Sequence, residues 1–252
     1  MTRPSAYIVT GTTRGLGKAL AEEIRARGHD LYSLSLGPER QDPGHTQVLC
    51  DLRDSRQVEH ALDRVLEQIR RHASDALVLI NNAAVLEPVG AIENLPRDAI
   101  RQHFQVNLLS PVQLTAGFIA GTRDFQGPRR IIHISSGAAR NPYAGWSLYC
   151  AAKAALNSFS ACVALEEEMR SGTVSICTVA PGVLDTDMQR LIRATDPALF
   201  PRRSKFVALH EEDKLTSPRV AARLLLDLDS GGGFENGGDY DLRTMGQTRP
   251  PA

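Results

Sequence analysis

Short apolar stretches alternate along this chain with longer stretches in which apolar residues recur at helical spacing. The short stretches predict seven strands, at residues 6–10, 30–35, 46–50, 76–80, 130–135, 174–179 and 238–242. The longer ones, such as residues 56–72, keep one apolar face and predict amphipathic helices. Regular strand–helix alternation favours an α/β fold, here a single-domain, Rossmann-type doubly wound parallel sheet of about seven strands with helices on both faces.

No shift in composition, internal repeat or linker divides the chain, so residues 1–243 are predicted to form one domain. Within it, residues 187–218 form a long stretch of mixed polar and apolar character, which we interpret as a lid over the substrate. Residues 244–252, which include Pro250 and Pro251, are expected to be a loose tail.

The charge balance excludes some partners. Lys plus Arg and Asp plus Glu number 29 each, so the net charge is zero and no basic excess indicates a nucleic-acid partner. No apolar run approaches the roughly 20 residues of a membrane span, and the first strand begins too early to leave room for a signal peptide. No histidine spacing indicates a metal site. We therefore expect a cytoplasmic protein without a membrane, nucleic-acid or metal partner.

The cysteines support a reducing compartment. None of the four forms a C-x-x-C pair, and Cys162 and Cys177 lie in apolar runs that predict core positions. We expect reduced thiols, as in other proteins of the cytoplasm, at Cys50, Cys150, Cys162 and Cys177.

A glycine-rich segment, TGTTRGLG at residues 10–17, joins the first predicted strand to a helix. Its glycines allow a sharp turn and a close approach to a pyrophosphate at the helix N-terminus, where free N–H groups and the helix dipole favour anions. The G-x-x-x-G-x-G spacing differs from the usual G-x-G-x-x-G, and a tight turn without a ligand is the alternative. The expected cofactor-binding residues are Gly11, Thr13, Arg14, Gly15, Leu16 and Gly17.

The cofactor predicted from the next segments is NADP(H). NAD enzymes usually place a carboxylate at the end of the second strand, but residues 33–37 (SLSLG) contain none. Arg14 can supply a forked positive charge to a 2′-phosphate, with Ser35 as a second contact, although a solvated surface arginine is the alternative. Asp51 and Leu52 follow the third strand and are predicted adenine contacts, unless Asp51 caps the following helix instead.

Tyr149 and Lys153 are four residues apart, so on a helix they share one face. A free tyrosine has a pKa of about 10 and is a poor acid–base catalyst at neutral pH. A nearby ammonium and an oxidised nicotinamide are expected to lower that pKa. A substrate carbonyl can then accept a hydrogen bond from Ser136 and a proton from Tyr149 while NADPH delivers hydride to its carbon. Taken alone, such a pair can also be an ordinary pair on a helix surface.

The chain resembles the short-chain dehydrogenases/reductases from end to end. The resemblance is carried, in the family order, by residues 10–17, NNAA at 81–84, Asn107, ISS at 134–136, YCAAK at 149–153 and PGVLDT at 181–186. It implies a catalytic tetrad of Asn107, Ser136, Tyr149 and Lys153 and a homodimer or homotetramer that uses the helix around residues 151–155. Ala84 stands where the family has glycine. The resemblance also implies a set of cofactor contacts, namely Asn82, Ala83, Tyr149, Lys153, Pro181, Gly182, Val183, Thr186 and Met188.

A proline interrupts the helix predicted over residues 99–120. Pro111 lacks an N–H, so the carbonyl of Asn107 loses its helical partner and the helix is expected to kink. In the resembling family this asparagine anchors a water that leads to the lysine. We hypothesise that Pro111 exposes that carbonyl to the proton relay; a kink without a catalytic role is the alternative. The hypothesis is wrong if Pro111→Ala retains full turnover and an unchanged pH–rate profile.

Within the family, residues 141–150, 164–167 and 180–189 resemble sepiapterin reductases and (S)-benzoin-forming benzil reductases. The predicted function is NADPH-dependent reduction of one carbonyl of an aromatic 1,2-diketone or α-hydroxyketone, a small-molecule substrate. Predicted substrate contacts are Ser136, Tyr149, Trp146 as an apolar wall, and Asp241 at the place where sepiapterin reductases anchor the pterin. Trp146 as packing, Asp239 as the anchor, or both aspartates as turn residues are alternatives.

Two other functions remain open at this point. A 3-oxoacyl-type reductase or a secondary-alcohol dehydrogenase uses the same fold, although the glycine-rich C-terminal stretch differs from the usual ending of the former. An NADP-sensing regulator is the alternative that is not an enzyme. Such regulators typically lack the tyrosine–lysine pair, which this chain retains.

Overall fold

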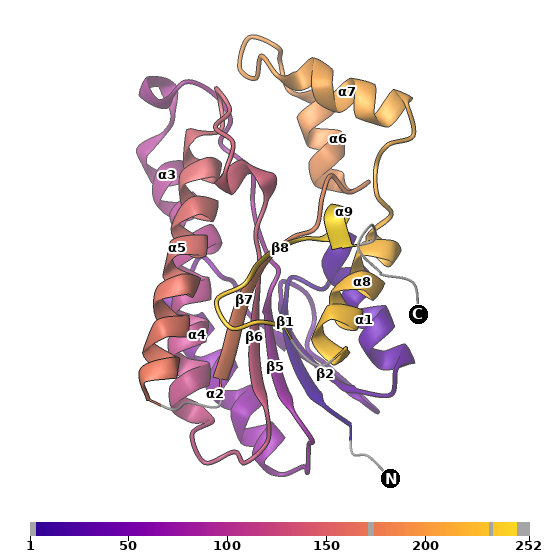
Figure 1. The fold of residues 1–252 in the computed structure, drawn as a ribbon. Coiled ribbons are helices and arrows are strands. Elements are labelled where there is room, and N and C mark those ends of the chain that lie inside the picture. The colour runs from indigo at the N-terminus through magenta and orange to yellow at the C-terminus, as the bar shows by residue number, and fades with distance from the viewer. Residues whose placement is uncertain (1–3, 171–173, 232–233, 246–252) are drawn as a thin grey trace.

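The computed structural model describes residues 4–170, 174–231 and 234–245, which form one eight-stranded sheet with helices on both faces (Figure 1). The strand order is β3-β4-β2-β1-β5-β6-β7-β8, and all neighbours are parallel except the β3–β4 pair. The doubly wound α/β fold predicted from the sequence is thus confirmed. The strands are β1 (Ala6–Thr10), β2 (Asp30–Ser35), β3 (Arg40–Asp42), β4 (His45–Leu49), β5 (Leu77–Asn81), β6 (Arg129–Ile134), β7 (Val174–Ala180) and β8 (Asp239–Asp241).

The strand predictions agree with the structure to within one residue at each end, except that β3 was not predicted. β3 is a three-residue edge strand that pairs antiparallel with β4, with Asp42 opposite His45. Its sequence, RQD, has no apolar residue and therefore no alternation to indicate a strand. The sheet is therefore parallel throughout except at this edge.

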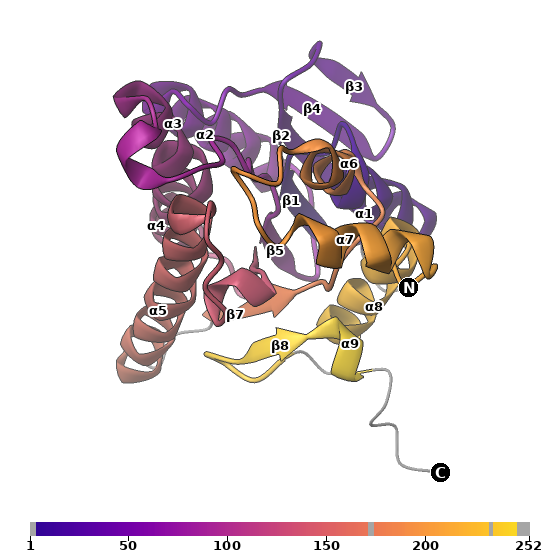
Figure 2. The same cartoon turned by 90° about the horizontal axis from the view of Figure 1, so that it is seen from above.

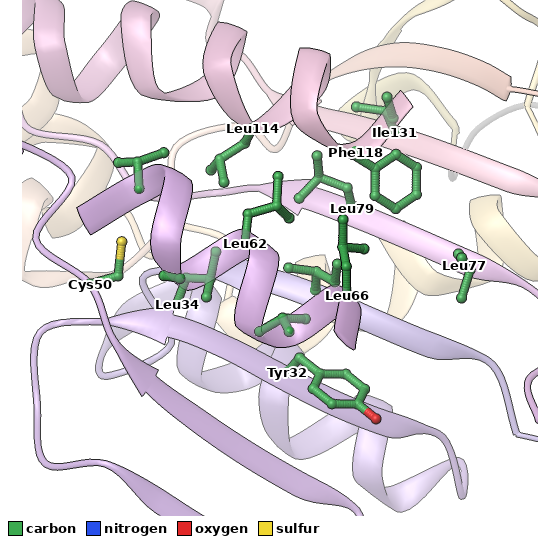
Figure 3. Close-up of a cluster of buried hydrophobic side chains, with 14 of the residues drawn as sticks. Tyr32, Leu34, Cys50, Leu62, Leu66, Leu77, Leu79, Leu114, Phe118 and Ile131 are labelled. Atoms are coloured by element: carbon green, nitrogen blue, oxygen red, sulfur yellow. The ribbon is translucent and has the colours of Figure 1, made fainter. Parts of the chain in front are cut away.

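Alternate side chains of each central strand pack into two cores. From β5, Leu77 and Leu79 enter one core, and Val78 and Ile80 enter the other. Figure 3 shows the first core, where Leu62, Leu114 and Phe118 meet the sheet. The helices of that face are α2 (Ser55–Arg70), α4 (Ser110–Gly121) and α5 (Ser147–Met169), whereas α1 (Gly15–Ala26) and α8 (Pro218–Ser230) cover the opposite face (Figure 1).

The helix predicted over residues 99–120 is divided into three parts. After α3 (Arg97–Phe104), a π-helical turn η2 (Gln105–Leu109) precedes α4, which has Pro111 in its first turn. In this turn the backbone N–H of Ser110 donates to the carbonyl of Gln105, five residues back. A π-helical turn that contains Asn107 therefore precedes Pro111, and the kink at Pro111 stays a prediction.

Above the carboxyl ends of the strands lie two helices of the predicted lid, α6 (Asp187–Ala194) and α7 (Arg203–Glu211) (Figures 1 and 2). Leu184 and Thr216 form a parallel bridge at the base of this segment. The remaining elements are short: the 3₁₀ turns η1 (Ile92–Asn94) and η3 (Gly137–Ala139), and α9 (Leu242–Met245). Residues 244 and 245 of the predicted tail belong to α9, and residues 246–252 lie outside the described residues.

Two expectations about apolar segments are corrected. By length and composition α5 is able to cross a membrane, so an apolar run does approach that length. It packs on β7 and η3 and buries Tyr149 and Lys153, so core packing accounts for part of its composition. All four cysteines are free thiols, with Cys50 and Cys177 buried, but Cys162 is exposed because α5 turns it outward.

Candidate active site

A cavity of about 820 Å³ opens at the carboxyl ends of the strands, between the glycine-rich loop, the start of α5 and the α6–α7 segment. This is where doubly wound sheets usually bind their ligands. Every cofactor-binding residue named from the sequence lines the cavity, as do Ser136 and Trp146. Asn107 and Asp241 do not line it.

The glycine-rich loop lies close to the neighbouring backbone. Gly11 and Gly15 have φ angles of +71° and +54°, which favour glycine, and a Cβ added to Gly11 would lie 2.9 Å from the Cβ of Ala83. The side-chain amide of Asn82 donates to the carbonyl oxygens of Thr10 and Gly11, at 2.9 and 3.2 Å. The loop is therefore fixed against β5, with the N-terminus of α1 facing the cavity, and it fits a dinucleotide pyrophosphate.

Charged side chains surround the part of the cavity that would hold the adenosine. The Arg14 side chain is 74% exposed, and its Nη1 lies 3.9 Å from Oδ2 of Asp187. Asp51 forms an ion pair of 2.6 Å with Arg53, a second arginine of the cavity that the sequence analysis did not single out. The alternative role of Asp51 as a helix cap is filled by Asp54, whose Oδ1 accepts from the backbone N–H of Arg56 at 2.9 Å.

Tyr149, Lys153 and Ser136 meet inside the cavity. The Lys153 Nζ donates to the carbonyl oxygen of Ile134 at 2.7 Å and lies 5.7 Å from the centroid of the Tyr149 ring. The Ser136 hydroxyl forms a hydrogen bond with the Tyr149 oxygen that lowers the pKa of Tyr149. The carboxyl end of β6 and the first turns of α5 thus place a hydroxyl, a phenol and an amine together.

The pKa of Tyr149 differs from the expectation. Burial between the rings of His103 and Trp146, whose centroids lie 6.3 and 6.0 Å away, raises this pKa to about 12 despite the Ser136 hydrogen bond. Because desolvation disfavours the phenolate more than the Ser136 hydrogen bond favours it, the pKa of Tyr149 is not lowered in the chain without its cofactor. A protonated phenol is the form that can donate a proton to a carbonyl.

Lys153 responds to burial in the opposite way, since desolvation lowers its pKa to about 8. We expect kcat/KM for carbonyl reduction to fall about tenfold per pH unit above pH 8, because the ammonium beside Tyr149 is lost there. Tyr149 stays protonated throughout this range. The measurement is kcat/KM between pH 6 and 10, and Lys153→Arg, which stays charged, is the control. The assignment is wrong if the arginine variant shows the same fall.

Asn107 does not line the cavity itself but is hydrogen-bonded to Val85, which does. Its side chain accepts from the backbone N–H of Val85 at 3.0 Å and donates to the carbonyl oxygen of Val85 at 2.8 Å. This pair of bonds holds the π-helical turn against the loop after β5. In the core, His133 forms hydrogen bonds with the hydroxyls of Thr115 and Ser160 at 3.0 and 3.1 Å.

The far end of the cavity is aromatic. Trp146 stacks on Phe200 with centroids 4.3 Å apart, and Phe206 and Tyr143 lie 5.3 and 5.1 Å from it. Trp146 is packed among these rings and also lines the cavity, and its role as a wall for an aryl ketone stays a prediction. Tyr143 and Phe206 line the cavity too. These two residues were not found from the sequence, because no spacing in the sequence indicates that α7 lies beside Trp146.

The two C-terminal aspartates are both engaged with arginines. Asp241 forms a bidentate pair with Arg243, with Nε–Oδ1 and Nη2–Oδ2 distances of 2.9 and 2.5 Å, and Arg243 rather than Asp241 lines the cavity. Asp239 pairs with Arg140 at 2.5 Å and accepts from Thr178 at 2.7 Å. Within the described residues, no cluster of His, Cys, Asp or Glu is placed to hold a metal ion.

The fold and the site together define a dinucleotide-binding oxidoreductase. Residues 5–197 match the family model described as short chain dehydrogenase, and the chain belongs to this family, whose members use NAD(P)(H). Structurally, the KRED1-Pglu enzyme superposes with a TM-score of 0.78 at 30% identity, covering 93% of this chain and 99% of that one.

Two curated relatives indicate the branch of the family to which the chain is similar. Benzil reductase ((S)-benzoin forming) of Bacillus subtilis is 35% identical, over 94% of this chain and 98% of the relative. Sepiapterin reductase of Mus musculus is 33% identical, over 93% and 95%. The chain is thus a short-chain dehydrogenase oxidoreductase, similar to reductases of carbonyl groups.

Proposed function

We propose that this protein is an NADPH-dependent reductase of one carbonyl of an aromatic 1,2-diketone or α-hydroxyketone. The observation that carries the proposal is that Ser136, Tyr149 and Lys153 share one cavity with an aromatic wall. Trp146, in contact with Tyr149, offers an aryl ketone an apolar surface beside the proton donor. The names of the benzil and sepiapterin reductases support the same substrate class.

Ser136, Tyr149 and Lys153 have different roles in the reduction of the carbonyl group. Ser136 donates a hydrogen bond to that oxygen, and Tyr149 transfers its proton to it. Lys153 then stabilises the phenolate, which is costly in this buried position. When bound, the reduced nicotinamide supplies the hydride that is added to the carbonyl carbon. One carbonyl thereby becomes a secondary alcohol, and the substrate gains one hydride and one proton.

The function is tested by following NADPH oxidation with benzil, 1-phenyl-1,2-propanedione, sepiapterin and an acetoacetyl thioester. We expect the diketones to be reduced with the highest kcat/KM. A preference for the thioester would favour the 3-oxoacyl reductase, and a preference for simple secondary alcohols with NADP⁺ would favour the alcohol dehydrogenase. Cofactor binding without turnover of any of these compounds would favour the regulator.

The choice of NADPH is assigned to Arg14 and Ser35. Arg14 is exposed beside the cavity and can turn from Asp187 to a 2′-phosphate, since a contact of 3.9 Å between exposed groups holds it weakly. We expect Arg14→Ala to raise the KM for NADPH about tenfold, the scale of one charge-assisted hydrogen bond, and to leave the KM for NADH unchanged. Arg190→Ala, which removes the other arginine beside Asp187, is the control. Equal effects on both cofactors would refute the assignment.

We also propose a homodimer or homotetramer. Leu165 and Met169 on α5 are 60% and 87% exposed, and such residues on one helix favour a contact between subunits. The measurement is the molar mass in solution by light scattering, and a monomer at micromolar concentration would contradict the proposal.

A further inference from the structure

One lysine is held at the aromatic end of the cavity. Lys205 on α7 lines the cavity, and its Nζ lies 3.3 Å from the Tyr143 hydroxyl oxygen. The same nitrogen lies 5.6 and 5.9 Å from the ring centroids of Tyr143 and Phe206, within the range of cation–π attraction. These contacts orient the ammonium beside the aromatic wall.

This lysine carries an unbalanced positive charge. Arg14, Arg53 and Arg243 also line the cavity, and each has an aspartate within ion-pair distance. For Lys205, no carboxylate of the described residues lies within 4.0 Å. Lys153, the remaining cation of the cavity, is buried at the other end of the wall beside Tyr149. The cavity therefore has an available ammonium that contacts Tyr143 and Phe206 rather than the proton donor Tyr149.

A row of contacting aromatic rings joins Tyr149 at one end of the cavity to Lys205 at the other. From Tyr149 the ring contacts pass to Trp146 at 6.0 Å, from Trp146 to Phe206 at 5.3 Å, and the Phe206 ring lies beneath the Lys205 ammonium. A substrate whose carbonyl reaches Tyr149 and whose aryl group lies along this wall would direct its far end toward Lys205. Glu87 is an acidic residue on the loop after β5 that also lines the cavity and weakens the positive field.

We propose that the preferred substrate is an aryl diketone with a carboxylate at the end remote from the reacting carbonyl. The Lys205 ammonium and the Tyr143 hydroxyl bind this carboxylate, one as an ion pair and the other as a hydrogen-bond donor. The inference rests on the proposed function, because it names the class of diketone that the same site reduces.

The test compares benzil, 4-carboxybenzil and the methyl ester of 4-carboxybenzil, which has the bulk of the acid without its charge. In wild type we expect kcat/KM for the acid to exceed that for the ester by about fivefold, the scale of one exposed ion pair. The ratio should fall to about one in Lys205→Met and persist in Lys205→Arg. It should also decrease in wild type as the salt concentration rises.

Lys214→Met is the matched control, since Lys214 pairs with Glu212 and does not line the cavity. Its acid-to-ester ratio should equal that of wild type, and thermal unfolding of each variant shows whether the fold is retained. If all three diketones and sepiapterin are inert in wild type, the proposed function fails. If only sepiapterin is reduced, the carboxylate subsite for diketones is overturned and the proposed function stands. If they are reduced but the ratio is one, or Lys205→Met leaves it unchanged, the carboxylate subsite is overturned and the proposed function stands.

Discussion

Tyr149→Phe should lower kcat for diketone reduction about 10³-fold, which corresponds to about 4 kcal/mol of transition-state stabilisation. The phenol is protonated at neutral pH because burial raises its pKa to about 12, so the hydroxyl is ready to donate. The variant keeps the ring that contacts Trp146 and His103 and loses only the proton donor. The measurement is kcat and KM for benzil at pH 7, together with the dissociation constant for NADPH from fluorescence.

Tyr32→Phe is the matched control, because it removes the same atom from a tyrosine in the core away from the cavity. It should retain kcat within about twofold. Ser136→Ala should lose about 10²-fold, since it removes a hydrogen bond to the carbonyl but leaves the proton. Wild-type turnover by Tyr149→Phe, with NADPH binding intact, would exclude Tyr149 as the acid.

The parts of the site that lie close together in the sequence were predictable. The glycine-rich loop and the Tyr149–Lys153 pair depend on spacings of a few residues, and the strands before them follow from local hydrophobic runs. The structure brings the corresponding residues to one cavity at the end of the sheet. Such features are local, so one sequence is enough to locate them.

The properties that were not predicted depend on distant neighbours. The pKa of Tyr149 is set by burial against His103, on α3, and no local spacing reports that burial. Lys205 meets Tyr143 only because α7 packs against the loop before α5. Arg243 forms an ion pair with Asp241, the residue that the resemblance implied as a substrate anchor. Polar contacts between residues far apart in the chain have no periodicity from which to predict them.

A buried ion pair near the amino ends of the strands should make one substitution strongly destabilising. Asp229 on α8 has a fully buried side chain that accepts from Arg130 Nε at 2.5 Å and from the Tyr7 hydroxyl at 2.7 Å. Asp229→Asn leaves the Arg130 guanidinium, which is largely buried, without its counter-charge. We expect the free energy of unfolding to fall by about 3 kcal/mol and the Tm by about 6 to 12 °C.

Asp227→Asn is the matched control for this prediction. Asp227 lies two residues earlier on the same helix, its side chain is 57% exposed, and it pairs with Arg27 at the surface. Its loss should cost less than about 1 kcal/mol. Urea unfolding of both variants measures the difference, and replacing Arg130 and Asp229 together by Met and Leu should recover most of the loss, because no buried charge then remains unpaired. Equal unfolding midpoints for the two asparagine variants would contradict a stabilising role for the buried carboxylate.

Since Arg130 lies at the amino end of β6, away from the cavity, kcat of the folded Asp229→Asn protein should match wild type at low temperature.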